Sequence, residues 1–237
     1  MSKPLAVVTG ASSGIGLAVA RALAADGHPL LLLARHHEPQ AGLDEERCRW
    51  MAVDVADYEA FAAAVAQAEA AFGGTDLLVN AAGFADARAF TEADPPRIRA
   101  EIETNLIGAM NGMKIVVAGM EARGSGTIVN ISSVSDRKTS PVAIAYTASK
   151  YGLRAAGESL REAEGMKGVR VVNLAPGYVR TNIHAGMGIS FEEYRRLLGN
   201  PDFLSAEELA EVVLYCYRLP QHICIRDLVI APTRSSF

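Results

Sequence analysis

Tyr146 and Lys150 have the residue types and the spacing of a proton-transfer pair. Residues four apart lie on one face of a helix, so the lysine ammonium can stand beside the phenol. A phenol with a pKa near 10 exchanges protons poorly at pH 7, and lowering that pKa by about 3 units takes roughly 4 kcal/mol of preference for the phenolate. A neighbouring cation supplies a preference of this sign. The alternative is that the pair is an ordinary patch of helix surface.

A glycine-rich segment near the N-terminus has the pattern of a phosphate-binding turn. The residues Thr9-Gly10-Ala11-Ser12-Ser13-Gly14-Ile15-Gly16 follow an apolar run at 5–8 and open a helical pattern at 15–25. Glycines let the backbone turn tightly and approach a ligand, and the helix that begins there offers unpaired N–H groups and a positive dipole end. The segment predicts a dinucleotide-phosphate site. The alternative is a tight strand-to-helix turn without a ligand.

Short apolar runs alternate with amphipathic or alanine-rich stretches along the chain. This alternation predicts repeated βαβ units, which form a parallel sheet with helices on both faces and bind ligands beyond the carboxyl ends of the strands. No linker rich in Pro, Gly or Ser divides the 237 residues, so we expect one domain. The expected strands are 5–8, 30–34, 50–53, 76–79, 127–131, 169–175 and 227–230, and the expected helices are 15–25, 57–72, 97–122, 146–165 and 205–218.

The composition argues against several classes of protein. A net charge of -4 and a pI near 5.8 do not provide the clustered positive charge of a nucleic-acid surface. Cys48, Cys216 and Cys224 are scattered and odd in number, which speaks against a disulfide framework or a metal site. No apolar run approaches the roughly 20 residues of a membrane span. We therefore expect a cytoplasmic protein that binds no nucleic acid, membrane or metal.

Further motifs follow the glycine-rich segment in a definite order. They are Asp54 after the third expected strand, Asn80-Ala81-Ala82-Gly83 after the fourth, Asn105 in the helix 97–122, Ser133 after the fifth strand, Tyr146-x3-Lys150, and Pro176-Gly177 after the sixth. With these elements in this order, the chain resembles the short-chain dehydrogenase/reductase family over nearly its whole length. The resemblance implies a single-domain, Rossmann-like, doubly wound parallel sheet of about seven strands in the order 3-2-1-4-5-6-7.

The resemblance also implies catalytic roles for Asn105, Ser133, Tyr146 and Lys150. Tyr146 would exchange a proton with the oxygen of a carbonyl or alcohol group while a nicotinamide exchanges a hydride with its carbon, and Ser133 would hold that oxygen by a hydrogen bond. Lys150 would bond the nicotinamide ribose and lower the pKa of Tyr146. Asn105 would anchor a water that passes protons to solvent. Its alternative role is a polar side chain that bonds nearby backbone.

The spacing selects one serine among several. Ser133 lies 13 residues before Tyr146, which is the separation usual in the family. The neighbouring candidates are Ser132, Ser135 and Ser140. We therefore expect Ser133 to be the serine of the active site.

The end of the second expected strand indicates which nicotinamide cofactor binds. Enzymes that prefer NAD usually place an acidic residue there, where it bonds the adenosine ribose 2′-hydroxyl. This chain has Ala34 followed by Arg35, whose cation suits a 2′-phosphate and contributes about 1.5 to 3 kcal/mol through a charge-assisted hydrogen bond. We therefore expect NADP(H), although Ser13 is neutral where some NADP-preferring relatives have a second basic residue. The alternative for Arg35 is a solvated surface residue.

Other cofactor contacts follow from the position of each residue in the family pattern. Asp54 would accept a hydrogen bond from the adenine amino group, and Val179 and Thr181 would reach the carboxamide. Each of these residues can instead belong to a turn or to the core. The full expected set is Gly10, Ser12, Ser13, Gly14, Ile15, Gly16, Arg35, Asp54, Val55, Asn80, Ala81, Gly83, Tyr146, Lys150, Pro176, Gly177, Val179 and Thr181.

The substrate side is the least specific part of the sequence. The stretch 176–204 reads as irregular, and residues 182–204 are expected to form a lid, since long irregular segments in compact domains are usually functional. The expected substrate contacts are Ser133, Tyr146, His184 and Met187, with Phe191, Tyr194 and Phe203 as apolar candidates and Arg180, Arg195 and Arg196 as candidate partners of a carboxylate. Each can instead be core packing or solvated surface. The segment 226–233 resembles the ending of relatives that act on 3-hydroxy acids such as serine.

Two other functions are compatible with the same fold. One is an NADP-binding, redox-sensing regulator without significant turnover, and the other is an interaction protein built on an unused nucleotide site. The presence of Ser133, Tyr146 and Lys150 favours an enzyme over both. Because relatives commonly assemble through the helices expected at 97–122 and 146–165, we also expect a homodimer or homotetramer.

Overall fold

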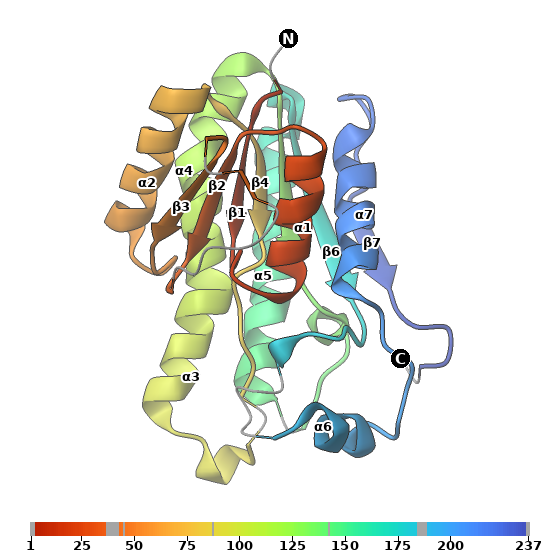
Figure 1. Cartoon of the computed structure of the whole chain (residues 1–237). Coiled ribbons are helices and arrows are strands. Elements are labelled where there is room, and N and C mark those ends of the chain that lie inside the picture. The colour runs from red at the N-terminus through yellow and green to blue at the C-terminus, as the bar shows by residue number, and fades with distance from the viewer. Residues whose placement is uncertain are drawn as a thin grey trace.

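Seven parallel strands form one sheet in the order β3-β2-β1-β4-β5-β6-β7, as the computed structural model shows (Figure 1). The strands are β1 (Leu5–Thr9), β2 (Leu30–Ala34), β3 (Cys48–Ala52), β4 (Thr75–Asn80), β5 (Gly126–Ile131), β6 (Val169–Pro176) and β7 (Asp227–Ile230). The structure describes residues 3–36, 43–44, 46–86, 88–141, 143–183 and 189–235. The predicted fold class and strand order are confirmed. The order reverses between β1 and β4, which is where doubly wound sheets form a ligand crevice.

Helices cover both faces of the sheet (Figure 1). On one face lie α1 (Gly14–Ala25) and α7 (Ala206–Arg218), and on the other lie α2 (Tyr58–Phe72), α4 (Gly108–Arg123) and α5 (Ile144–Glu164). Successive residues of β1 alternate between the two cores, since Val7 packs on the α2 and α4 side and Val8 on the α1 and α7 side. Burial on both faces explains why the strands read as continuous apolar runs.

The helix predicted at 97–122 is not one regular helix. It consists of α3 (Pro95–Ile102), a π-helical turn at Glu103–Ile107 and α4. A π-helical turn holds one extra residue and so changes the direction in which the following side chains point. Asn105 lies inside this turn. The prediction of an uninterrupted helix is therefore wrong at Asn105.

The described part of the segment 176–204 is more regular than its sequence indicates. It contains α6 (Phe191–Leu197), which begins with a capping box in which Ser190 and Glu193 exchange side-chain to backbone hydrogen bonds. The Ser-x-x-Glu pattern that produces this box is present in the sequence and was the available signal for the helix. Within the described ranges, no helix combines the length and the hydropathy that a membrane span requires.

Candidate active site

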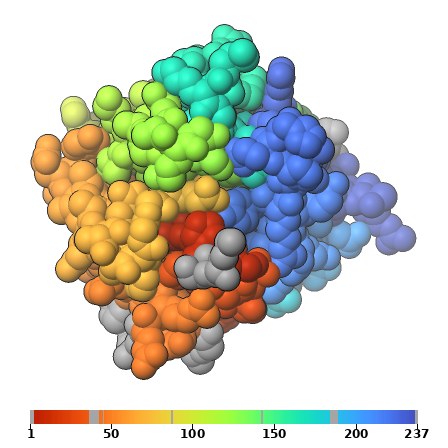
Figure 2. All heavy atoms as spheres, turned by 90° about the horizontal axis from the view of Figure 1, so that it is seen from above, coloured from red at the N-terminus to blue at the C-terminus, as the bar shows by residue number. Residues whose placement is uncertain are grey.

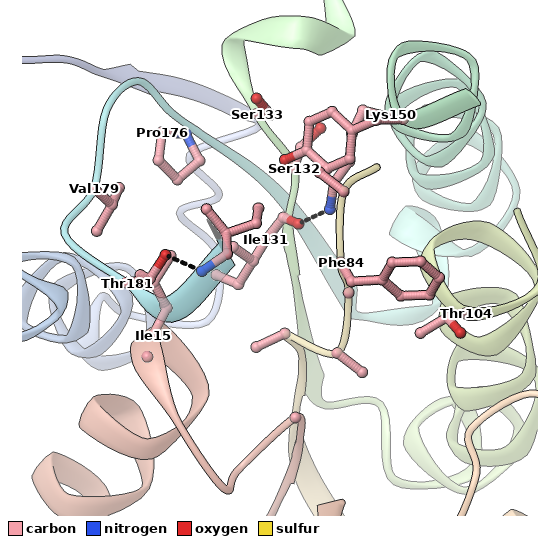
Figure 3. Close-up of a pocket in the computed structure, with 18 of the residues that line it drawn as sticks. Ile15, Phe84, Thr104, Ile131, Ser132, Ser133, Lys150, Pro176, Val179 and Thr181 are labelled. Carbon is pink, nitrogen blue, oxygen red and sulfur yellow. Dashed lines mark hydrogen bonds between the residues drawn. The ribbon is translucent and has the colours of Figure 1, made fainter. Parts of the chain in front are cut away.

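A pocket of about 600 Å³ opens at the carboxyl ends of the central strands. Its wall contains the turn after β1, the ends of β2 to β6, the first turns of α5 and part of α6. Figure 3 shows Lys150, Phe84 and Thr104 on one side of this pocket and Val179 and Thr181 on another. Parallel strands point their carboxyl ends to one edge of the sheet, and this brings the motifs of the sequence together.

The glycine-rich turn has the tight backbone geometry that the predicted phosphate site requires. Gly10 has a φ of 65°, and a Cβ atom there would lie 2.7 Å from the Cα atom of Ala82. The helix α1 begins at Gly14, the Ser13 side chain forms no capping hydrogen bond, and Ile15 and Gly16 of the first turn line the pocket. The Thr9 hydroxyl accepts hydrogen bonds from the backbone N–H groups of Ala81 and Ala82, at 3.0 and 3.1 Å. The turn is thus fixed against the end of β4 and leaves room for an anion.

Replacing Gly16 with alanine is expected to weaken NADPH binding by more than about tenfold, because the new Cβ atom would collide with the backbone carbonyl of Gly10. The matched control is Gly119→Ala, also in a helix, where the nearest atom to a Cβ is the flexible end of Arg123 at 3.3 Å. Fluorescence titration with NADPH checks both variants. Equal affinity in Gly16→Ala and the parent protein would contradict the close approach of this turn.

The part of the pocket next to the ends of β2 and β3 contains Arg35, the residue expected to select the cofactor. Arg35, directly after β2, lines the pocket together with Ala34, Asp54 and Val55. Asp54 also accepts a hydrogen bond from the Ala56 N–H at 3.0 Å, so its carboxylate is held by its own turn. These residues therefore offer one cation and one oriented carboxylate at the end of the pocket where the sequence predicts the adenosine ribose.

The structure brings Ser133, Tyr146 and Lys150 together in the wall of the pocket. A hydrogen bond joins the Ser133 and Tyr146 hydroxyls. The Lys150 Nζ atom lies 5.5 Å from the centre of the Tyr146 ring and donates a hydrogen bond to the Ile131 carbonyl at 2.8 Å (Figure 3). The spacing of Tyr146 and Lys150 on α5 thus produces the predicted pairing, with the two side chains on the same side of the helix.

Burial opposes ionisation of both members of this pair. It raises the pKa of Tyr146 to about 12, and the hydrogen bond from Ser133 reduces the rise. Burial lowers the pKa of Lys150 to about 8, while Asp136 and Glu101 favour the ammonium. In the protein without cofactor, burial is the largest influence on the phenol, and the lowering of the Tyr146 pKa by Lys150 and an oxidised nicotinamide stays a prediction. The phenol keeps its proton at neutral pH, which suits a proton donor.

Two asparagines predicted for the site lie behind the pocket wall. Asn105 donates to the Phe84 carbonyl at 2.9 Å and accepts from the Phe84 N–H at 3.0 Å, and it also donates to the Ser149 hydroxyl at 3.1 Å. Asn80 donates to Asn130 at 2.9 Å and does not line the pocket. Asn105 therefore positions the wall and the start of α5. The position of Asn80 argues against the cofactor contact predicted for it and favours a structural role between β4 and β5.

A buried polar network, which sequence reasoning missed, holds the segment that carries Ser133. Asp136 is 0% exposed and accepts hydrogen bonds from Ser132 at 2.8 Å and from Asn173 at 2.9 Å. Arg137 bonds both Asp136 and Asp227 of β7, at 2.6 and 2.7 Å. The network fixes the turn after β5 to two neighbouring strands. An acidic residue in a short polar run such as 132–140 gives no sequence signal that distinguishes burial from exposure.

The substrate side of the pocket is partly as predicted. Tyr194 lines it, with Tyr178, Ile183 and Leu198 as neighbours that were not predicted. Phe203 does not line the pocket but packs against Tyr178, Phe191 and Tyr194, with ring centres 5.1 to 6.2 Å apart. Arg180, Arg195 and Arg196 also lie outside the pocket wall, and Arg180 stacks on Phe191 at 5.1 Å. His184 and Met187 lie outside the described residues.

Comparisons with known proteins show which family the chain belongs to. The family model for short chain dehydrogenases matches residues 4–188. The chain is 33% identical over 98% of its length to a glycine betaine reductase of Emericella nidulans, of which it spans only 19%. It is 30% identical to an uncharacterised oxidoreductase of Staphylococcus saprophyticus, covering 96% of this chain and 97% of that protein.

A solved structure agrees over the whole fold. A serine dehydrogenase in its closed form, complexed with NADP+, superimposes with a TM-score of 0.91 at 26% identity, covering 98% of this chain and 96% of that one. The two folds therefore correspond over nearly the whole chain. The chain belongs to the short-chain dehydrogenase family of oxidoreductases.

Proposed function

We propose that this protein interconverts a carbonyl and an alcohol on a small substrate by hydride transfer from or to NADP(H), with Tyr146 as the acid and base. The observation that carries the proposal is the convergence of Ser133, Tyr146 and Lys150 in one pocket, whose other end contains the glycine-rich turn and Arg35. Bound NADPH would supply the hydride, and the residues of the chain would bind and orient the substrate and protonate its oxygen.

The protonation state of the site supports reduction at neutral pH. Charge develops on the carbonyl oxygen as the hydride arrives at its carbon, and the Tyr146 phenol, which holds its proton, donates to that oxygen. Ser133 adds a second hydrogen bond to the same oxygen, where preorganised donors stabilise the developing charge. In the oxidation direction the phenolate must form, and the Lys150 ammonium together with a positively charged oxidised nicotinamide favours it.

Lys150 would have two partners when the cofactor is present. Its Nζ atom is held by the Ile131 carbonyl at the floor of the pocket, which leaves two of its three N–H donors for other groups. We assign these to the nicotinamide ribose hydroxyls. Asn105 would act behind the wall, where its bonds to Phe84 and Ser149 fix the segments on either side of Lys150.

The same pocket supports NADP(H) rather than NAD(H) as cofactor. Arg35 lines it directly after β2 and no acidic residue stands at Ala34. The serine dehydrogenase with TM-score 0.91 was solved with NADP+. A 2′-phosphate at this position would gain a charge-assisted hydrogen bond from the guanidinium.

Arg35→Ala is expected to weaken NADPH binding by about tenfold to a hundredfold, because removing a charge-assisted hydrogen bond costs about 1.5 to 3 kcal/mol. NADH binding should change less than about twofold, since NADH has no 2′-phosphate for the cation to bond. The ratio of kcat/KM for the two cofactors measures the effect and provides its own control. A parent enzyme that prefers NADH would show that Arg35 has another role.

The proposed reaction is tested with a panel of small aldehydes, ketones and hydroxy acids. NADPH oxidation or NADP+ reduction is followed by absorbance at the reduced nicotinamide band. Turnover with any of these substrates that is lost in a Ser133→Ala, Tyr146→Phe double variant supports the enzyme. Tight NADPH binding with no turnover across the panel would favour the redox-sensing regulator instead.

The substrate class and assembly extend this proposal. The likeness to a serine dehydrogenase and the segment at 226–233 favour hydroxy acids and the corresponding carbonyl compounds as the first compounds to test.

Exposed apolar residues on the outer surface of the α3 to α5 layer, including Ile107, Met110 and Tyr151, favour a homodimer or homotetramer. Light scattering at micromolar concentration distinguishes these from a monomer.

A further inference from the structure

Glu101 is a buried carboxyl beside the active site that the proposed mechanism does not use. It lies on α3, one helical turn before Asn105, and is 1% exposed. Its Oε1 atom accepts a hydrogen bond from the Asp86 backbone N–H at 3.1 Å. Arg97, on the same helix, forms its ion pair with the Asp86 carboxylate at 2.9 Å. A carboxyl in this position is costly to bury and invites a functional explanation.

Glu101 and Asn105 hold the same stretch of chain. Asn105 bonds the backbone of Phe84, and Glu101 bonds the backbone of Asp86, two residues further along. The stretch 83–85 between β4 and these bonds lines the pocket. The two side chains therefore fasten the wall of the pocket to successive turns of one helix.

The charged groups around Glu101 come from each element packed against it. Asp86, after β4, opposes its ionisation, while Arg97 on α3 and Lys150 on α5 favour it. In the other direction, Glu101 favours the Lys150 ammonium and opposes ionisation of Tyr146. Asp136, after β5, acts on Lys150 and Tyr146 with the same signs.

A small cavity lies next to the carboxyl. Its volume is about 20 Å³, enough for a single water molecule. It is lined by Glu101, by Asp86 and Arg88 of the segment after β4, and by Ile144 and Ala145 at the start of α5, among others. Glu101 thus borders both this cavity and the segment that leads into Tyr146.

We propose that Glu101 is a positioning residue that holds the 83–86 wall of the pocket and sets the charge balance of Tyr146 and Lys150. Its ionised form stabilises the Lys150 ammonium, and its protonated form does not. The effect of this charge balance on turnover rests on the proposed oxidoreductase function.

The titration of the two groups places this effect near neutral pH. Burial raises the pKa of Glu101 to about 7, and burial lowers the pKa of Lys150 to about 8. Above pH 7 the carboxylate is present and supports the ammonium. Below pH 7 the carboxyl is neutral, and Lys150 remains protonated without it.

Glu101→Gln separates the two roles, because the amide keeps an oxygen for the Asp86 N–H and removes the charge. Glu103→Gln is the matched control, since Glu103 lies two residues away, is half-buried and carries the same charge. The side-chain carbons of the five lysines are followed by NMR against pH in the protein alone, with Lys150 assigned by Lys150→Arg.

We expect the Lys150 midpoint to fall by about half to one pH unit in Glu101→Gln, a threefold to tenfold change in its acid dissociation constant. Glu103→Gln should leave it in place. In the parent protein, the Glu101 carboxyl carbon should titrate near pH 7, which can be measured even if the variant does not fold. An unchanged Lys150 midpoint, an equal shift in the control, or a Glu101 midpoint near that of an exposed glutamate overturns the proposal.

The same variants are then compared in turnover. With a carbonyl substrate from the panel, Glu101→Gln should move the basic limb of the kcat/KM profile to lower pH and leave the values at pH 6 within about twofold. A uniform loss at every pH would mean a structural role only and would also overturn the proposal. Because the NMR titration needs neither cofactor nor substrate, its outcome is independent of whether the proposed reaction is correct.

Discussion

Tyr146→Phe is expected to lower kcat by about a hundredfold to ten-thousandfold, the range that general acid catalysis contributes. The substitution removes only the hydroxyl that bonds Ser133 and that lies nearest the expected position of the substrate oxygen. The ring and its contact with Lys150 are retained, so the pocket keeps its shape. NADPH affinity should therefore stay within about twofold of the parent value.

The control for this variant is Tyr151→Phe, which removes the same hydroxyl from the same helix at a position that is 40% exposed. It should leave kcat unchanged. The measurement is steady-state turnover of NADPH at saturating cofactor, together with a fluorescence titration of each variant. Turnover of Tyr146→Phe within a factor of three of the parent would mean that another group donates the proton.

Arg170→Met is expected to reduce the free energy of unfolding by about 3 to 5 kcal/mol, the cost of leaving several buried acceptors without a donor. Arg170 lies on β6 and is 5% exposed. It donates to the Thr127 hydroxyl at 2.7 Å and to the carbonyls of Tyr217 and Leu219, each at 2.9 Å. Methionine has a similar length and no donor, so each of these oxygens loses its partner.

The segment that Arg170 holds connects α7 to β7. Figure 2 looks onto this end of the molecule, where the blue C-terminal end of α7 lies beside the green and teal segments that lead into β5 and β6. Gln221, in the same segment between α7 and β7, donates a hydrogen bond to the Gly168 carbonyl at 2.8 Å. Arg21→Met, on the exposed surface of α1, is the control and should change stability by less than about 0.5 kcal/mol. Urea unfolding measures both variants, and a loss below 1 kcal/mol in Arg170→Met would contradict the assignment.

The regular elements were accessible from the sequence because their signals are local. The apolar run at 30–34 is β2 without change, and the other predicted strands agree with the structure to within two residues at each end. The convergence of the glycine-rich turn, Ser133 and Tyr146 was also accessible, since parallel strands in the predicted order must bring their carboxyl ends to one edge. The catalytic and cofactor roles of these residues stay predictions.

What the sequence did not provide depends on contacts between distant segments. Asn80 was expected in the pocket, but its side chain shares the face of Leu78, two residues earlier, and points toward α4. Arg170 and Glu101 look like surface residues of a strand and a helix, and only their tertiary partners explain their burial. The raised pKa of Tyr146 has the same origin, since it results from the protein packed around the phenol.

The π-helical turn at Glu103–Ile107 has a consequence for how this protein can change over generations. A π-helical turn amounts to a single inserted residue, so loss of one codon within it would restore a regular helix. Each residue of an α-helix turns the next by about 100°, and the deletion would rotate α4 by that amount relative to α3. Met113 and Val116 of α4, which pack in the core against the sheet, would then turn away from it if α3 kept its place. Insertions and deletions should therefore be tolerated far less here than in the surface loops of the same chain.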